Sequence, residues 1–136
     1  MKTSFRSIFG ISILLSLQIN AQKNDIDSQL KKCLDKDYST AGQVNCSDSA
    51  RDAWDAEMNK YYQMTLKKLP KAQQSELITA QKAWLKFRDA EFTLIDNYYY
   101  NVKQGTMFQI MAAGEKVNVV KTRAKQLQVY YEVLEY

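Results

Sequence analysis

The scarcity of helix-breaking residues constrains the fold of this chain more than any other feature of its sequence. Between Gly42 and Gly105 the only proline or glycine is Pro70, whereas alanine, leucine, lysine, glutamine and glutamate recur throughout. These five residue types are among the best helix formers. We therefore expect one helix of about 28 residues that ends before Pro70 and a second long helix that begins there.

Start signals predict where two of the helices begin. Thr40 is expected to cap the second helix, because Gln43 follows three residues later, as in a capping box. The same pattern in Thr106 and Gln109 predicts the start of a fourth helix. Gly114 inside that helix lowers its propensity by about 1 kcal/mol relative to alanine, which allows a kink or a frayed turn at residues 113–115.

The third helix carries an unusually wide apolar stripe. Two rows of mostly large apolar side chains recur along it at seven-residue steps, and such width is typical of a helix that contacts two neighbours. We therefore place it in the middle of an antiparallel bundle. The predicted fold class is all-α, with three long helices plus a short N-terminal helix. The rows are Leu77, Trp84, Glu91 and Tyr98, and Ile78, Leu85, Phe92 and Tyr99.

The N-terminus has the pattern of a secretory signal peptide. Lys2 and Arg6 precede an apolar run over residues 8–19. Spanning a bilayer needs about 20 such residues, so a retained anchor is disfavoured. We predict removal of residues 1–21, a single domain over residues 22–136, and export to the periplasm or the exterior without stable membrane insertion.

Two cysteines are predicted to form one disulfide. A short first helix, capped by Asn24 or Asp25 and running to about Asp35, would carry the first of them. An exported chain meets an oxidising compartment, so Cys33 and Cys46 should be bonded. Closing a loop of that size is worth about 3 kcal/mol in the chain-entropy model. A metal site is not expected, because the chain has no histidine and no second cysteine pair.

Charge argues against nucleic acid as a partner. The full chain has 19 lysines and arginines against 15 aspartates and glutamates, and loss of the signal peptide removes two basic residues and leaves a net charge of +2. Basic and acidic residues are interspersed through every expected helix, whereas nucleic-acid binding needs a concentrated basic face. In the fourth helix, Glu115, Glu132 and Glu135 also disfavour binding to an anionic membrane surface.

No residue is predicted to be catalytic, and no cofactor is expected. Without histidine, a serine nucleophile would need a lysine or another unusual base, and no recognisable motif supplies one. A glycine-rich phosphate loop is missing as well. Among the carboxylates only Glu57 and Glu91 are expected near a helix interface, whereas acid–base catalysis needs a pair in a perturbed environment.

Three unlike side chains share one face of the third helix, because Gln81, Trp84 and Arg88 are three and four residues apart. An inward-pointing Arg88 would require a carboxylate, with Glu91 as the nearest and Glu57 on the second helix as another. Such a cluster is either a recognition site or a network that fixes how the helices dock. We favour the network, because inward-pointing residues in mid-helix are poorly placed to meet a protein partner.

Consecutive tyrosines at positions 98–100 close the third helix. They cannot all be buried, since neighbouring helical residues point about 100° apart. At least one ring should therefore be exposed, where tyrosine can anchor a protein contact. Packing at the end of the bundle is the favoured role for the group, and Tyr100 is a candidate contact residue.

Three segments of the chain resemble the LprI-type lysozyme inhibitor family, small helical proteins of the bacterial envelope. They are residues 80–89, with the pattern Gln-x-x-Trp-x-x-x-Arg, and residues 58–62 and 123–127. The predicted disulfide is similar to the family's first one, whereas Phe92 stands where many relatives have a further cysteine, whose usual partner is missing as well. The resemblance assigns structural motif positions to Met58, Asn59, Tyr62, Gln81, Trp84, Arg88, Asp89, Glu91 and Arg123.

The resemblance implies inhibition of lysozyme, which would protect a bacterial cell wall. An inhibitor need only plug the cleft of a glycosidase, where two catalytic carboxylates lie at the base of a groove. The disulfide-closed loop offers cationic and aromatic groups for this purpose, and its crosslink lowers the ordering cost of binding. The candidate partner-binding residues are Lys36, Tyr38 and Ser39 in this loop, and Tyr100.

Two other functions stay open. One is a non-catalytic envelope module that binds a different protein through an exposed tyrosine end, and the other is a wall-active enzyme. Common animal lysozymes are basic, so a chain at +2 would be repelled by them at long range. Local acidic clusters such as Asp48, Asp52 and Asp55 are expected to compensate.

Overall fold

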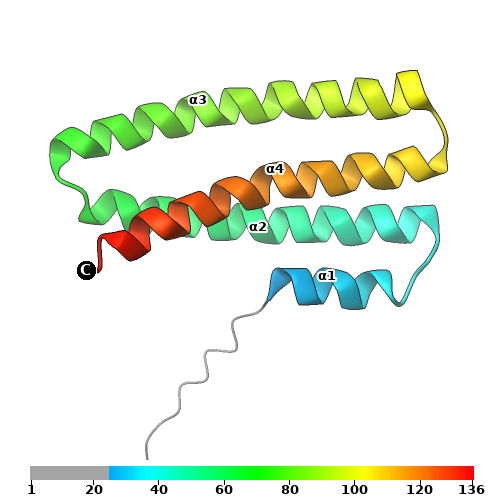
Figure 1. Ribbon diagram of the computed structural model, residues 1–136, viewed down its shortest axis with the longest axis horizontal. Coiled ribbons are helices and arrows are strands. Elements are labelled where there is room, and N and C mark those ends of the chain that lie inside the picture. Colours follow the sequence, from blue (N-terminus) through cyan, green and yellow to red (C-terminus); the bar gives the residue numbers. More distant parts are fainter. Residues whose placement is uncertain (1–24) are drawn as a thin grey trace, which may run out of the picture.

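The computed structural model describes residues 25–136, and every regular element in that range is a helix. Three long antiparallel helices follow a short one (Figure 1), which confirms the predicted fold class. The expected signal peptide over residues 1–21 lies outside the described residues. The elements are α1 (Ile26–Leu34), α2 (Thr40–Lys68), α3 (Lys71–Asp96), the π-helix η1 (Asn97–Lys103) and α4 (Thr106–Val133).

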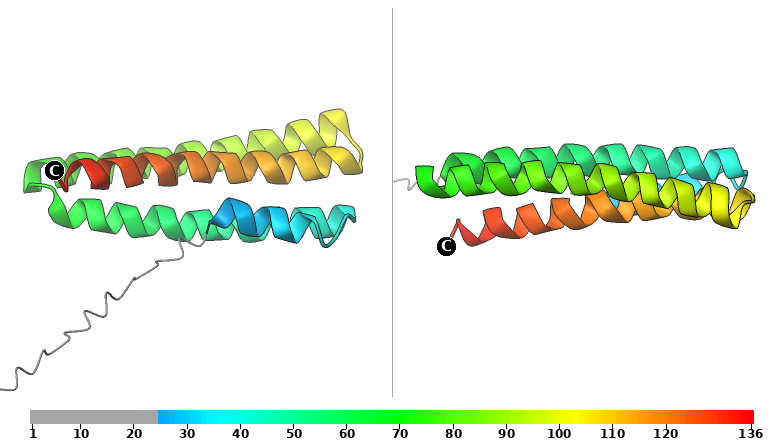
Figure 2. Two further views of the ribbon diagram at one scale, coloured as in Figure 1. Left: turned by 60° about the horizontal axis from the view of Figure 1, so that its bottom comes forward. Right: turned by 90° about the horizontal axis from the view of Figure 1, so that it is seen from above.

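The turns between helices gather at the two ends of the bundle. The α1–α2 turn and the η1–α4 turn lie at one end, which we call the η1 end (Figure 1). The α2–α3 turn and the C-terminus lie at the opposite end, as both views in Figure 2 also show. The α2–α3 connection is as tight as expected, with only Leu69 and Pro70 between the two helices. Within residues 25–136, no helix combines the length and the apolar character needed to cross a membrane.

The closest pair of helices is α2 and α4. The largest fully buried side chains all come from this pair, Met58 and Thr65 from α2 and Val120 and Leu127 from α4. Small buried residues such as Ala124 let the two backbones approach. The centre of the hydrophobic core therefore lies between α2 and α4.

The prediction that the third helix is central is wrong. Only Leu77, Gln81 and Ile95 of α3 are buried. Its apolar stripe is wide because it includes half-buried residues that pack at the rim of the core, and Phe87 and Leu94 lie exposed outside it. A wide stripe thus reflects partial exposure here, rather than contact with two neighbours, and α3 is the outer cover of the α2–α4 pair.

The N-cap of helix α2 lies one residue before the predicted cap. Ser39, not Thr40, is the N-cap, and its hydroxyl oxygen accepts a hydrogen bond from the Gly42 amide at 3.0 Å. The Gln43 side chain reaches past the cap and donates to the Tyr38 carbonyl oxygen at 3.0 Å. Serine and threonine are both good N-caps, so the sequence pattern does not distinguish adjacent candidates.

Helix α4 also departs from the prediction at its start. Its N-cap is Gly105, with φ of 110°, and Thr106 is the first helical residue rather than a cap. The helix then runs without interruption to Val133, so the frayed turn allowed by Gly114 is not realised. A methyl group added at Gly114 would meet open space, so no close neighbour requires glycine at this position.

The disulfide is confirmed. Cys33 of α1 is bonded to Cys46 of α2, with the two Cα atoms 5.7 Å apart. The bond fixes one end of α1 against α2, while Ile26 at the other end of α1 is buried in the core cluster. Asp25 occupies the N-cap position of α1 but its side chain makes no capping hydrogen bond.

Candidate protein-binding end of the bundle

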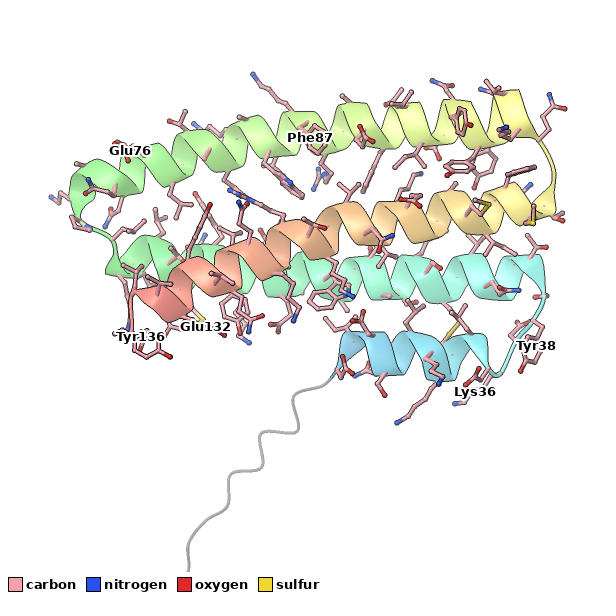
Figure 3. All side chains as sticks on the ribbon, in the orientation of Figure 1. Lys36, Tyr38, Glu76, Phe87, Glu132 and Tyr136 are labelled. Atoms are coloured by element: carbon pink, nitrogen blue, oxygen red, sulfur yellow. A yellow bond between two sulfur atoms is a disulfide. The ribbon has the colours of Figure 1, made fainter. Side chains whose placement is uncertain are left out.

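The α1–α2 turn presents two of the predicted contact residues to solvent. Lys36 and Tyr38 point away from the helices at the η1 end (Figure 3). Tyr38 retains 77% of its possible exposure. Ser39 is exposed as well, but its hydroxyl oxygen is occupied as the N-cap of α2. Lys36 and Tyr38 are therefore the available groups of the turn.

Short-range hydrogen bonds hold this turn in one shape. The Asp37 Oδ1 atom accepts from the Ser39 amide at 2.9 Å, in addition to the Ser39 cap and the Gln43 bond described above. Hydrogen bonding to Ser39 lowers the pKa of the Asp37 carboxyl below its usual value. With the disulfide immediately beside it, the turn offers Tyr38 on a preorganised support, which reduces the entropy lost on binding.

The π-helix η1 forms the second exposed part of the same end. Tyr98 and Tyr100 are exposed, whereas Tyr99 is half-buried and its ring lies 6.4 Å from that of Phe108. The expectation that at least one of these rings is exposed is confirmed. Val102 and Met107, at 70% and 61% exposure, extend the apolar surface into the start of α4.

The backbone here is unusual for a helical bundle. After the wide π turn, Gln104 adopts φ of 55°, the only positive value for a non-glycine residue in the described part of the chain. Irregular turns and positive φ values recur at functional sites in proteins. The sequence did not reveal this feature, because Asn97–Lys103 reads as a continuation of α3.

The buried polar contact inside the bundle involves Arg123 rather than Arg88. Arg123 retains 7% exposure and its Nε atom donates to Gln81 Oε1 at 3.0 Å. Its Nη1 atom donates to Gln126 Oε1. Among the residues described, Nη2 has no partner, and burial lowers the pKa of the guanidinium. No carboxylate within residues 25–136 forms an ion pair with it, so the contact is a packing feature rather than an accessible site.

Arg88 lies at the flank of α3. Its Nε and Nη2 atoms donate to Asp89 Oδ1 at 2.9 and 2.7 Å, and its guanidinium lies 5.7 Å from the centre of the Trp84 ring. The expected pairing with Glu91 is therefore wrong. The core-facing side of α3 is centred on Gln81, which turns Arg88 far enough outward to reach water and Asp89.

The expected partner of Arg88 on α2 is engaged elsewhere, and so is the nearby motif residue Asn59. Glu57 pairs with Lys60 at 3.2 Å, and Asn59 donates to Asp55 at 3.0 Å. Apart from Asn59 and Asp89, which are exposed, the other motif positions belong to the interior or its rim. Met58 is buried, while Tyr62 and Trp84 are half-buried against the core.

The acidic residues of α2 do not form a free cluster. Arg51 pairs with Asp48 at 2.7 Å and with Asp52 at 3.1 Å. Asp55 lies 3.7 Å from Arg88 Nη1. These pairs offset the negative charge, so this cluster does not supply the compensation that the sequence suggested.

Fold and surface together define a small disulfide-linked helical bundle with an exposed aromatic end. A sequence profile of the family described as lysozyme inhibitor LprI matches residues 31–127, and the chain belongs to this family. The crystal structure of an uncharacterized protein from Burkholderia thailandensis is similar, with a TM-score of 0.75 and 31% identity. The similarity covers 82% of this chain but only 55% of that one, so this chain spans about half its length. No curated protein sequence matches the chain.

Proposed function

We propose that this protein binds a lysozyme and blocks it without catalysing a reaction, and that it does so through the η1 end of the bundle. Membership of the lysozyme inhibitor family supports the partner. The observation that supports the surface is Tyr38, an exposed aromatic side chain on a disulfide-closed turn, at the same end as the exposed rings of Tyr98 and Tyr100.

The chemistry of the turn suits a lysozyme cleft. Glycosidases of this kind carry two carboxyl groups on either side of the scissile bond, in a groove shaped for sugar rings. The Lys36 ammonium group complements those carboxylates, and the Tyr38 ring takes the place of a sugar ring against the groove wall. Because the turn is already ordered, binding loses little conformational entropy.

The proposed location follows from the same function. We propose that residues 1–21 are removed on export and that residues 22–136 act as one domain in the periplasm or outside the cell. The Cys33–Cys46 disulfide supports an oxidising compartment.

Lysozyme inhibition by three proteins tests the proposal. Wild type should inhibit lysis of a peptidoglycan suspension, and Tyr38→Ala should weaken inhibition at least tenfold, as expected for an interface anchor. Tyr136→Ala is the matched control, because Tyr136 is fully exposed at the opposite end of the bundle (Figure 3). Equal inhibition by all three proteins would exclude Tyr38 as an anchor.

A second candidate is a non-catalytic module that binds another envelope protein. The exposed surface of Tyr100, Val102 and Met107 favours it, because such a surface suits many protein partners. The two candidates differ in one assay. An envelope module would leave lysozyme activity unchanged, and clearing of peptidoglycan without added lysozyme would instead identify a wall-active enzyme.

A further inference from the structure

A shallow groove of about 260 Å³ lies between α3 and α4 beside η1. Its walls are apolar and aromatic, with Leu94 and Tyr98 on one side and Val119 on the other. Two carboxylates also line it, Glu91 from α3 and Glu115 from α4. Pockets for drug-sized ligands measure about 300–1,000 Å³, so this groove is sized for a single side chain.

Both carboxylates of the groove are free of ion pairs with other residues of the described chain. The nearby lysines are engaged elsewhere. Lys116 pairs with Asp96 at 2.5 Å and lies over the Phe92 ring, and the Lys103 ammonium is 5.7 Å from the centre of the Tyr98 ring. The groove therefore keeps its negative charge, unlike the acidic residues of α2.

We infer that this groove receives an arginine side chain of the bound lysozyme, an inference that rests on the proposed function. A guanidinium group stacks on a tyrosine ring and donates hydrogen bonds to two carboxylates in its own plane, a geometry that a lysine ammonium does not match. The Leu94 and Val119 side chains suit the aliphatic part of the same side chain. The groove is continuous with the exposed η1 surface through Tyr98.

The groove also offsets the electrostatic repulsion between this net-positive protein and a basic lysozyme. Residues 22–136, with a net charge of +2, repel a basic lysozyme at long range, whereas unpaired carboxylates near the η1 end attract it locally and orient it. Attraction of this kind is screened by salt. Association should therefore slow as ionic strength rises, instead of accelerating as it would if net repulsion dominated.

Binding of an animal lysozyme by calorimetry tests the groove with two charge-matched double variants. Glu91→Gln with Glu115→Gln should weaken binding at least tenfold. Glu76→Gln with Glu132→Gln changes the net charge equally at the opposite end of the bundle (Figure 3) and should stay within twofold of wild type. Equal weakening in both variants, or none in the groove variant, would overturn the inference.

A second measurement separates failure of the groove from failure of the proposed function. If wild type binds no lysozyme, the proposed function fails, and the groove is judged by NMR titration with N-acetyl-arginine amide. Chemical-shift changes centred on Tyr98 and Val119 would support an arginine-binding groove. They should be larger than those from N-acetyl-lysine amide and should be lost in the groove variant. Equal or absent shifts would reject it.

Discussion

Arg123 Nε donates a hydrogen bond to Gln81 Oε1 at 3.0 Å, which joins α4 to α3 inside the bundle. The Gln81 amide continues the contact to α2, since its Nε2 atom lies 3.6 Å from Met58 Sδ. All three long helices therefore meet at one glutamine. Because α3 contributes few buried side chains, this contact is its buried polar attachment to the α2–α4 pair, in addition to two more exposed ion pairs, Lys116 with Asp96 and Arg88 with Asp55.

Replacing Gln81 should destabilise the protein strongly. Gln81→Ala removes a hydrogen-bond partner from a buried guanidinium and leaves a cavity, and we expect a loss of about 3 kcal/mol in the free energy of unfolding. Urea denaturation followed by circular dichroism measures it. Gln73→Ala, at an exposed position of the same helix, is the control and should change stability by less than about 0.5 kcal/mol.

A compensating double variant tests the reason for that loss. Gln81→Leu together with Arg123→Met replaces the polar contact by apolar side chains and should recover most of the stability, since buried charged groups are often replaceable in this way. If the double variant is less stable than Gln81→Ala, the cost does not come from the unpaired guanidinium.

Arg88 should contribute much less to the free energy of unfolding than its place in the sequence motif suggests. Its hydrogen bonds to Asp89 lie at the surface, where solvent weakens ion pairs, so Arg88→Ala should lower the free energy of unfolding by about 1 kcal/mol or less. The measurement is a melting curve beside that of Gln81→Ala. A larger effect for Arg88→Ala than for Gln81→Ala would contradict the assignment of Arg123 as the buried arginine.

These two arginines show how far the sequence determines the interior. Spacing along a helix identifies which side chains share a face, and it correctly grouped Gln81 with Trp84 and Arg88. It does not determine how far that face is turned toward the core. That angle depends on the close approach of α2 and α4, which small residues such as Ala124 permit. Arg123 is buried in the bundle, which helical spacing alone does not predict, although the family resemblance assigns Arg123 a structural motif position.

The candidate site was predictable only in part. The cysteine pair identified the turn that carries Tyr38, because a disulfide and its loop are visible in the sequence. The groove of Glu91 and Glu115 depends on the register between two helices that are joined through η1. A π-helix has no clear sequence signature, so neither the register nor the groove follows from helical periodicity.

Removing the disulfide should loosen α1 before the rest of the bundle. Cys33→Ser with Cys46→Ser should cost about 3 kcal/mol of stability. Because the largest fully buried side chains, such as Met58 and Leu127, come from α2 and α4, amide hydrogen exchange should accelerate in α1 and the α1–α2 turn more than in α2 and α4. Uniform acceleration across all helices would show that α1 is an integral part of the cooperative core instead.

Acid should release the turn that presents Tyr38. The pKa of Asp37 is lowered in the folded protein from an ordinary value of 3.8, so its bond to the Ser39 amide contributes stability above that value and loses it as pH falls through the folded pKa. The Ser39 amide resonance, followed by NMR below about pH 4, should report this transition.

Asp37→Asn keeps an acceptor oxygen but does not titrate, so its Ser39 resonance should stay unchanged over the same range. A transition of equal size in the variant would assign the titration to another group.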